Sequence, residues 1–598
     1  MTMKTPLQLT WDLDAIYPGG SESEEFANFL EELDADVQAY AARMNGLEEE
    51  QLDAAGWDEL LAITQNINMR VRNAFAFASC LVSQNVKDQK AKLLQGRIQQ
   101  LSALSQSAQT KLDKAIMAVP ADRWQSLLQD DRLAPLAFNL EERRRRASEK
   151  LAPEMEALIG NLSVDGYHAW GSLYNTVIGR MTIPYEHNGE LKQLSVGQAQ
   201  NMMRHPDAAV RAGVFAKWEE AFADNAELIS ASLNHLAGFR LQTYKARGWE
   251  SVHQEPLDIN RMSQETLDVM WDVIDRNKEP FVQYLNRKAK LLGLEKLSWC
   301  DYYAPIGSAS SQMSYDEGAA FIVEQFAKFS PKLADFTVKA FEKSWIEAED
   351  RAGKRPGGFC TSFPVEKESR IFMTYDRSPG GVATLAHELG HAYHQSVMND
   401  LPYMVQGYAM NVAETASTFA ELIVSDAALQ NAQSEEERLA LLDNKLQNAV
   451  AFFMDIQSRF TFETNFYAER KKGPVAAERL NELMVEAQQQ AFRGALDQYH
   501  PHFWASKLHF HSTGVPFYNF PYTFGYLFSA GVYARALQEG EGFEDKYIDL
   551  LRDTGRMQVE DLAMKHLGVD LTKPEFWQSA VDLALADAEE FLKMTEGK

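Results

Sequence analysis

The chain has few cysteines and no long apolar segment. Its three cysteines in 598 residues are widely separated, at Cys80, Cys300 and Cys360. An odd and scattered set does not form a disulfide framework and is typical of reduced thiols in a cytosol. The sequence contains no run of about 18 apolar residues, the length needed to span a bilayer. Residues 1–6 lack the apolar core of a signal peptide. We therefore expect a cytoplasmic protein without membrane contact.

Repeats, low-complexity tracts and long flexible linkers are also missing. Length alone suggests roughly four domains of ~150 residues, but without linkers one large body is the better expectation. Positive charge is scarce, since 59 Lys and Arg face 85 Asp and Glu, a net charge of −26. Such a surface repels nucleic acid and anionic membranes. The short basic run at 143–146 is flanked by glutamates, and we expect it to be a solvated helix face.

Apolar side chains recur at three- and four-residue intervals through most of the chain, which predicts helices. The clearest stretches are 26–33, 85–117, 197–247, 263–293, 316–350, 431–470 and 476–497. Residues 180–194 carry an Asn-Gly turn between short extended segments and predict a hairpin. Residues 369–375 predict a strand. Two roles stay open for that strand: an exposed edge that binds extended peptides, or the closing of a small sheet.

Two histidines, His387 and His391, stand four residues apart in a helix-patterned stretch, and Glu388 follows the first. This spacing places both imidazoles on one side of a helix. Two imidazoles one turn apart bind a Zn²⁺ ion while the adjacent carboxylate serves as general base. Chance would produce the pattern about 0.04 times in a chain of this composition. The motif predicts a zinc peptidase; the alternative is a helix whose histidines only pack or cap.

A catalytic zinc takes three protein ligands and leaves one position open, and Glu414 is the predicted third ligand. It lies 27 residues after His387 in a second helix-patterned stretch. A loop broken at Gly407 has room to fold this helix against the first. Glu421 lies seven residues further, near the same face, and is either an alternative ligand or a carboxylate that orients an imidazole. His394, on the first helix, is not expected to bind the metal.

Three runs of sequence carry a family resemblance: GKRPGGF at 353–359, TLAHELGHAYH at 384–394 and AETAS at 413–417. Together they resemble the oligoendopeptidase F group of the thimet oligopeptidase family. Residues 11–17 are similar to the opening of that group, and 517–522 with 525–527 are similar to its C-terminal substrate-contact stretch. The resemblance covers most of the chain and is specific at the predicted zinc site.

The resemblance implies a zinc-dependent endopeptidase that hydrolyses internal bonds of short, unfolded oligopeptides in a deep channel. Its zinc ligands would be His387, His391 and Glu414. Glu388 would take a proton from water and return one to the leaving amine. A zinc carboxypeptidase or dipeptidyl carboxypeptidase on the same helical scaffold is the alternative, and it would need a basic group for the terminal carboxylate. A non-enzymatic protein with a structural zinc would need a fourth ligand such as Cys or His.

In the same family, a histidine and one or more tyrosines hold the substrate carbonyl oxygen in the transition state. His509 best fits that histidine, while Tyr518, Tyr522 and Tyr526 remain open for the tyrosine. Phenol and imidazole are suitable donors because peptide hydrolysis builds negative charge on this oxygen. The alternative is that these aromatic side chains are core residues.

We therefore expect a mainly α fold, with a large multi-helix body, a deep substrate channel and a small β-sheet near the zinc helix. The predicted division is an N-terminal helical domain over residues 1–195 and a zinc metallopeptidase domain over 196–598. One Zn²⁺ per chain is the expected cofactor. Oligopeptides are the expected partners, and nucleic acid and membranes are not.

Overall fold

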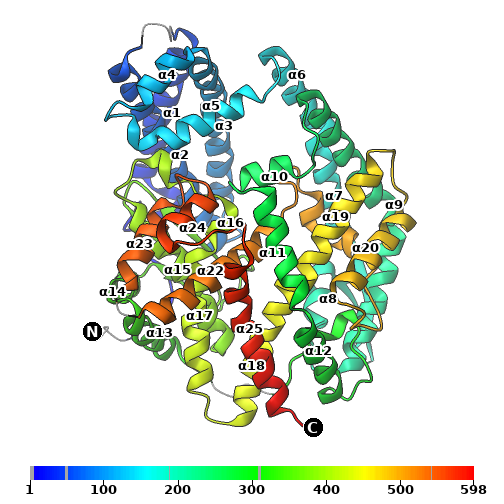
Figure 1. Cartoon of the computed structure of the whole chain (residues 1–598). Helices are drawn as coiled ribbons and strands as arrows, with labels where there is room; N and C mark the ends of the chain where they lie inside the picture. The colour runs from blue at the N-terminus through cyan, green and yellow to red at the C-terminus, as the bar shows by residue number, and fades with distance from the viewer. Residues whose placement is uncertain (1–5, 48–51, 188, 308–311, 541, 598) are drawn as a thin grey trace.

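A computed structural model describes residues 6–47, 52–187, 189–307, 312–540 and 542–597. Helices form most of it (Figure 1), so the predicted mainly α fold is confirmed. Residues 1–5, part of the segment without a signal core, lie outside these ranges, as does Asn188 of the predicted hairpin turn. The three cysteines form no disulfide.

The N-terminal helices gather at one end of the molecule, at the top left of Figure 1. Helices α1, α2 and α3 are capped by Ser23, Asp53 and Asp88, the residues just before them, whose side chains each accept a hydrogen bond from the first turn. The elements up to the first strand are η1 (Gly20–Glu22), α1 (Glu24–Asn45), α2 (Ala54–Gln84), α3 (Gln89–Ala118), α4 (Ala121–Leu128), η3 (Ala134–Leu136), α5 (Ala137–Ser148), α6 (Pro153–Ser163), η4 (Val164–His168) and α7 (Ala169–Arg180).

The remaining helices form two further groups. The helices α7, α9, α19 and α20 contact one another on the right of Figure 1, whereas α13–α17, α22 and α23 lie on the left below the N-terminal helices. Their bounds are α8 (Val196–Met202), α9 (Ala208–Arg247), α10 (Gln254–Ile259), α11 (Gln264–Arg276), α12 (Glu279–Leu291), η5 (Trp299–Asp301), α13 (Tyr315–Phe329), α14 (Pro331–Glu342), α15 (Pro379–Met398), η6 (Tyr403–Gln406), α16 (Met410–Ala413), α17 (Thr415–Gln430), α18 (Glu435–Val450), η7 (Ala451–Asp455), α19 (Ile456–Arg470), α20 (Ala477–Ala491), α21 (Phe503–Ser506), η8 (Leu508–His511), α22 (Phe520–Glu539), α23 (Phe543–Asp553), α24 (Val559–Leu567) and α25 (Pro574–Met594).

Several predicted helical stretches are interrupted by local breaks. The stretch 197–247 divides into α8 and α9 because Asp207, after Pro206, caps a new helix and its Oδ1 accepts from Ala209 N at 2.9 Å. The stretch 316–350 stops being helical at Glu342, since Ser344 takes a left-handed φ of 51° and the chain then enters a strand. Apolar periodicity predicted that these helices exist but not where they end.

The chain buries two hydrophobic cores. The first contains side chains between residues 11 and 140 together with Phe363, Phe372 and Val405 from much later in the sequence. The second runs from Tyr174 to Phe591 and includes most of the other helices. The two cores meet at a small sheet, whose side chains contribute to both. The boundary at residue 195 stays a prediction.

Two small sheets are present. Strands β1 (Thr182–His187) and β2 (Glu190–Ser195) pair antiparallel, which confirms the predicted hairpin. The second sheet has the order β3-β5-β4, with β3 (Ile346–Glu347) parallel and β4 (Phe359–Phe363) antiparallel to β5 (Glu368–Phe372). Strand β5 is the strand predicted over 369–375. It lies in the middle with both edges paired, so it closes the sheet and cannot be the peptide-binding edge. Strand β4 is at an edge of this sheet, so the role of peptide-binding edge stays open for β4.

The arginine run on α5 is engaged with neighbouring helices, and the expectation of a merely solvated face was wrong. Arg143 forms an ion pair with Asp113 of α3. Arg146 Nε donates to Asp258 Oδ2 of α10 at 2.7 Å, and Arg145 pairs with the same carboxylate. Because the carboxylates come from helices distant in sequence, the run could not reveal its partners. The arginines join the N-terminal helices to the second core.

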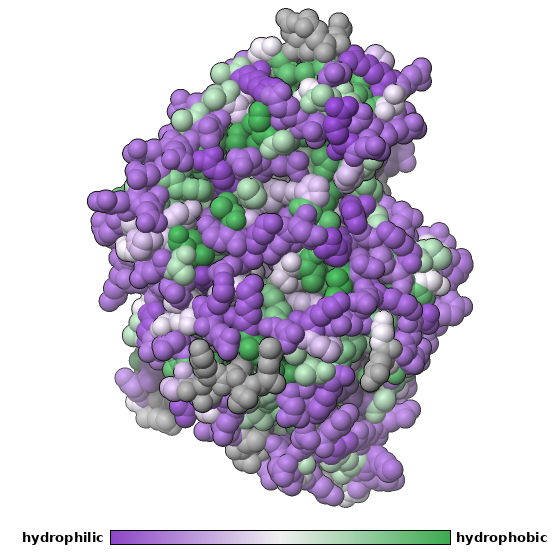
Figure 2. Space-filling model, turned by 90° about the vertical axis from the view of Figure 1, so that its left-hand side faces the viewer, coloured by the Kyte–Doolittle hydropathy of each residue, from purple (hydrophilic) through white to green (hydrophobic). Residues whose placement is uncertain are grey.

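The surface is largely hydrophilic. Figure 2 shows mainly polar side chains on the face seen there, with apolar residues in small separate groups. Among the described residues, no helix is long and apolar enough to cross a membrane.

Candidate active site

Helix α15 presents the two predicted histidine ligands. It begins at Pro379, whose fixed φ suits the first helical position, and Ser378 Oγ accepts from Gly381 N at 3.0 Å. His387 and His391 lie one turn apart with ring centroids separated by 4.9 Å. The helix therefore places both imidazoles on one face, as the spacing predicts.

Glu414 lies at a break between two helices. Helix α16 ends at the residue before it and α17 begins at the residue after it. Ser417 Oγ donates to Glu414 Oε2 at 2.8 Å, and Ser529 Oγ of α22 donates to the backbone oxygen of Glu414 at 2.9 Å. Glu414 is thus held by hydrogen bonds to both its carboxylate and its backbone oxygen.

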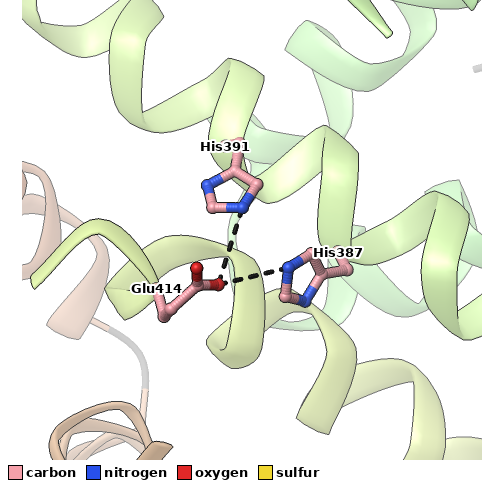
Figure 3. Close-up of side chains that lie close together, drawn as sticks. All are labelled: His387, His391 and Glu414. Atoms are coloured by element: carbon pink, nitrogen blue, oxygen red, sulfur yellow. Dashed lines mark ion pairs between the residues drawn. The ribbon is translucent and has the colours of Figure 1, made fainter. Parts of the chain in front are cut away.

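These three side chains converge on one point (Figure 3). Glu414 Oε2 is 3.2 Å from His387 Nε2 and 3.5 Å from His391 Nε2. The ligand atoms of all three lie within 4.8 Å of one another, and no other such cluster occurs in the part of the chain that is described. Ligand atoms 2.0–2.2 Å from a tetrahedral zinc lie about 3.3–3.6 Å apart. Two imidazoles and one carboxylate at this spacing fit a zinc ion with one open position.

Two glycines allow the helices to come this close. A Cβ at Gly390 would lie 2.4 Å from Ala416 O and 2.6 Å from Ser417 Cα, so α17 crosses α15 directly against its backbone. A Cβ at Gly525 of α22 would lie 2.9 Å from Glu414 Cβ. The side chain of any other residue would push these helices apart. The glycines therefore set the distance between Glu414 and the histidines.

Hydrogen bonds orient both imidazoles. His387 Nδ1 lies 3.0 Å from Glu421 Oε2, which favours a proton on Nδ1 and directs Nε2 towards Glu414, where a metal would bind. His391 has a hydrogen bond with the backbone of Ala413. Of the two roles left open for Glu421, this geometry favours the orienting carboxylate. Glu414, not Glu421, is in the three-residue cluster.

The local charges couple the three groups. Burial alone would lower the pKa of His387, but hydrogen bonds to Glu414 and Glu421 raise it to about 10. Burial alone would raise the pKa of Glu414, but the two histidines lower it to about 2. Burial lowers the pKa of His391 to about 4. Glu414 is therefore an anion beside the two imidazoles, which is the charge that a cation site requires.

Glu388 is a buried carboxyl without a hydrogen-bond partner for one oxygen. Its side chain is 7% exposed, and Oε2 has no partner within the described ranges. Burial raises the pKa of Glu388 to about 7. Gly358, the residue before β4, lies close to this carboxyl, because a Cβ there would be 3.5 Å from Glu388 Oε1 and 3.2 Å from Phe372 O. Glu388 also lines two cavities, in which a reacting water has room.

Three cavities meet at these residues. The main cavity, of about 1100 Å³, is lined by His387, Glu388 and residues of α17 and α18. Arg204, which follows α8, and Tyr303, which follows η5, also line it. The strand cavity, of about 470 Å³, is lined by β4, Glu388, His391 and Glu414. The tyrosine cavity, of about 290 Å³, is lined by His387, Glu414, Tyr522 and Tyr526, among others. A long ligand could therefore extend past the site on more than one side.

The four proposed oxyanion residues divide into two groups. Tyr522 and Tyr526 line the tyrosine cavity beside His387 and Glu414. Tyr518 stacks on His509 with ring centroids 4.7 Å apart, and its ring lies 6.0 Å from that of Tyr522. Burial and the nearby Arg459 lower the pKa of His509 to about 4, which keeps its imidazole neutral.

The structure also places residues that the sequence did not single out. Tyr408 and Arg72 line the strand cavity. Tyr408 stacks on His394 at 4.2 Å, and His394 is fully buried with Nε2 2.9 Å from Thr554 Oγ1. His394 is therefore buried against Tyr408 and Thr554, and it lies outside the three-residue cluster. Arg72 belongs to the N-terminal helices, and nothing in the sequence around it indicates a place near Glu388.

Comparison with known proteins agrees with this site. Residues 201–583 match the model of peptidase family M3, and residues 116–183 match the model for oligopeptidase F. Oligopeptidase PepF from Bacillus subtilis is 22% identical over 95% of this chain and 84% of its own length. The fold is similar to that of oligoendopeptidase F from Enterococcus faecium, with a TM-score of 0.71 and 17% identity over 96% of this chain and 99% of the other. A Chlamydophila abortus protein assigned as a peptidase gives a TM-score of 0.82, with 18% identity over 98% of both chains. The first family model covers more than half of the sequence, so the chain belongs to peptidase family M3, in its oligopeptidase F group, and is a metallopeptidase.

Proposed function

We propose that this chain is a zinc-dependent endopeptidase that hydrolyses internal peptide bonds of short oligopeptides. His387, His391 and Glu414 would hold the zinc, and Glu388 would be the general base. The observation that carries the proposal is the cluster of three ligand atoms within 4.8 Å, next to a buried carboxyl and open to large cavities. The similar proteins named oligopeptidase and oligoendopeptidase support the choice of short peptides as substrates.

Zinc, when bound here, supplies positive charge that polarises the scissile carbonyl and lowers the pKa of water. Glu388 accepts a proton from the attacking water and then returns a proton to the leaving nitrogen. Its burial excludes bulk water from one side of the carboxyl, and its position on α15 fixes it beside the metal ligands. Glu421 holds the His387 imidazole in the tautomer with Nε2 free.

Tyrosine hydroxyls would stabilise the negative charge that develops on the carbonyl oxygen. Tyr522 and Tyr526 are favoured because both line the tyrosine cavity beside the metal ligands. His509 stacks on Tyr518, whose ring lies 6.0 Å from that of Tyr522, and neither residue lines any of the three cavities. Each of the three tyrosines is replaced by Phe in turn. The variant whose turnover falls roughly 10²–10³-fold while its zinc is retained identifies the donor.

Cleavage of internal bonds fits the arrangement of the cavities. The main cavity and the strand cavity both reach Glu388 and together can hold residues on the two sides of the cleaved bond. A carboxypeptidase or dipeptidyl carboxypeptidase would need the peptide to end close to the metal, so it is the second candidate.

The remaining predictions have indirect support. The three free cysteines support a cytoplasmic location. The two family models, ending at 183 and starting at 201, support a division near residue 195 between an N-terminal helical domain and a catalytic domain. The two hydrophobic cores place the division earlier, because the continuous part of the first core ends at residue 140 and the second core begins at residue 174.

The deciding experiment uses an internally quenched peptide with blocked ends. Wild-type protein should cleave it, a chelator should stop cleavage, and added zinc should restore it. Glu388→Gln should keep stoichiometric zinc and lose nearly all turnover. Glu324→Gln is the matched control, because this exposed carboxylate lines the same main cavity and pairs only with Lys328 among the cations described. Near wild-type turnover by zinc-loaded Glu388→Gln would show that Glu388 is not the base.

A further inference from the structure

The strand cavity contains one arginine without a carboxylate partner. Arg72 projects from α2 and is half-buried at the cavity wall. Its Nη2 donates to Thr361 Oγ1 of β4 at 3.2 Å. No carboxylate among the described residues lies within 4.0 Å of this guanidinium. A half-buried charge is therefore left with a single neutral partner.

Three other arginines of the N-terminal helices pair with carboxylates, whereas Arg144 lacks one among the described residues but donates to Val119 O at 2.7 Å and lies over the Trp124 ring. Arg43 binds Glu59 at 2.9 Å, Arg70 pairs with Asp36 two residues before Arg72, and Arg143 pairs with Asp113. The chain has 26 more acidic than basic residues, so carboxylates are plentiful. A guanidinium matches a carboxylate with two parallel hydrogen bonds, and leaving it unpaired in a partly buried place is unfavourable.

The rest of the strand cavity is neutral apart from the active-site groups. Among the described residues, Arg72 is the only Lys or Arg that lines it. The carboxylates in its wall are Glu388 and Glu414, which the proposed reaction already uses. The remaining polar side chains in the wall are neutral: Cys360, Ser362, Ser369, Gln395 and Tyr408. The cavity therefore offers one positive charge to whatever enters it from the metal site.

The distance from Arg72 to the reacting centre follows from β4. Gly358 borders Glu388, and Thr361, which binds Arg72, is three residues further along the strand. At about 3.3 Å per residue this is about 10 Å. An extended peptide advances by the same amount, so the guanidinium would meet a substrate about three residues from the cleaved bond.

We propose that Arg72 binds a carboxylate of the peptide substrate in the strand cavity, about three residues from the cleaved bond. The inference rests on the proposed peptidase function and adds a preference for acidic peptides. The carboxylate comes either from an Asp or Glu side chain or from the C-terminus of a short peptide. Both sources give the same two-point contact with the guanidinium.

The test compares matched peptides that differ in one charge. In a quenched peptide with amidated C-terminus, Glu is moved through positions on both sides of the cleaved bond, and each peptide is paired with its Gln counterpart. A second pair has a free or an amidated C-terminus about three residues from the bond. Wild-type protein should prefer the carboxylate roughly 10-fold in kcat/KM at one of these positions.

Arg72→Gln should remove that preference, so that each charged peptide and its neutral counterpart are cleaved with equal kcat/KM. Arg72→Lys should keep part of it, because the charge remains without the two-point geometry. Arg97→Gln is the control for net charge, since Arg97 of α3 is 3.9 Å from Asp34 and lines none of the three cavities. A preference for the free C-terminus alone would identify the carboxylate as terminal, and a preference at one Glu position would identify it as a side chain.

Binding separates this proposal from the proposed function. The same fluorescent peptides are titrated onto Glu388→Gln protein, with and without Arg72→Gln, by anisotropy. A carboxylate-dependent affinity that Arg72→Gln abolishes supports the proposal even if no peptide is cleaved, and absent cleavage then counts against the peptidase function only. The proposal for Arg72 would be overturned if wild-type protein bound and cleaved charged and neutral peptides equally. It would also be overturned if Arg72→Gln lost affinity equally for both peptides and had a lower melting temperature, because that indicates a purely structural contact with β4.

Discussion

Substituting Gly390 with alanine should separate the two helices that carry the proposed metal ligands. The new Cβ would lie 2.4 Å from Ala416 O, whereas ordinary contact begins near 3.4 Å. The atoms it meets belong to the backbone of α17, so no side chain can rotate away. The helices must therefore move apart by about 1 Å, the difference between these distances. Zinc sites tolerate departures of about 0.2 Å in their bond lengths, so the ligand set would no longer fit.

The expected stability change has two opposing parts. Overpacking of this kind lowers the free energy of unfolding by about 1–3 kcal/mol. Replacing a helical glycine by alanine raises it by about 1 kcal/mol, because alanine has the higher helix propensity. The matched control is Gly96→Ala in the interior of α3, where an added Cβ meets nothing within 4 Å. Gly96→Ala should therefore raise the apparent melting temperature slightly, and Gly390→Ala should lower it.

Differential scanning fluorimetry of both variants, with excess zinc and with chelator, gives the melting temperatures. Competition with a chromophoric chelator gives the zinc affinity, which should fall at least about 10-fold for Gly390→Ala and stay unchanged for Gly96→Ala. If Gly390→Ala behaved like Gly96→Ala in both measurements, the close crossing of α15 and α17 would not control the site.

Three further outcomes follow from the geometry. Glu414→Ala should weaken zinc binding by more than the roughly 10–100-fold expected for Glu421→Ala, because the first removes a ligand and the second an orienting contact; the reverse order would make Glu421 the ligand. His509→Ala should keep zinc and lower kcat by roughly 10²–10³ with a smaller change in KM, and unchanged kcat would place the oxyanion donors elsewhere. Burial alone would raise the pKa of Glu219 on α9, but two neighbouring histidines lower it from 4.5 to about 2, so its stabilisation is present above pH 4.5 and is lost as the pH falls towards 2. Glu219→Gln should accordingly flatten the decline of the melting temperature over that window, and an unchanged slope would contradict the lowered pKa.

Local spacing explains why much of the site was predictable. His387 and His391 are one helical turn apart, so their common face depends only on α15 being a helix. Glu414 required more, since its side chain lies at the break between α16 and α17 and not on a helix face. The stretch was predicted as helical, and the break appeared only in the structure.

Contacts between distant segments were not predictable from local pattern. The strand at 369–375 was expected, but its central place between β3 and β4 depends on how the chain returns. Gly390 is visible in the sequence, while the backbone of α17 lying against it is not. Arg72 carries no local signal, because its significance comes from β4 and Glu388, which lie far later in the chain.

The composition of the first hydrophobic core has a consequence for how the chain is made. Phe363, Phe372 and Val405 complete a core that otherwise consists of residues 11–140, and all three are fully buried there. During synthesis the N-terminal helices leave the ribosome long before these side chains do. Their apolar faces must remain partly uncovered until about two-thirds of the protein has been translated, up to Val405 of 598 residues. The N-terminal helices therefore need protection from aggregation while the rest of the protein is being made.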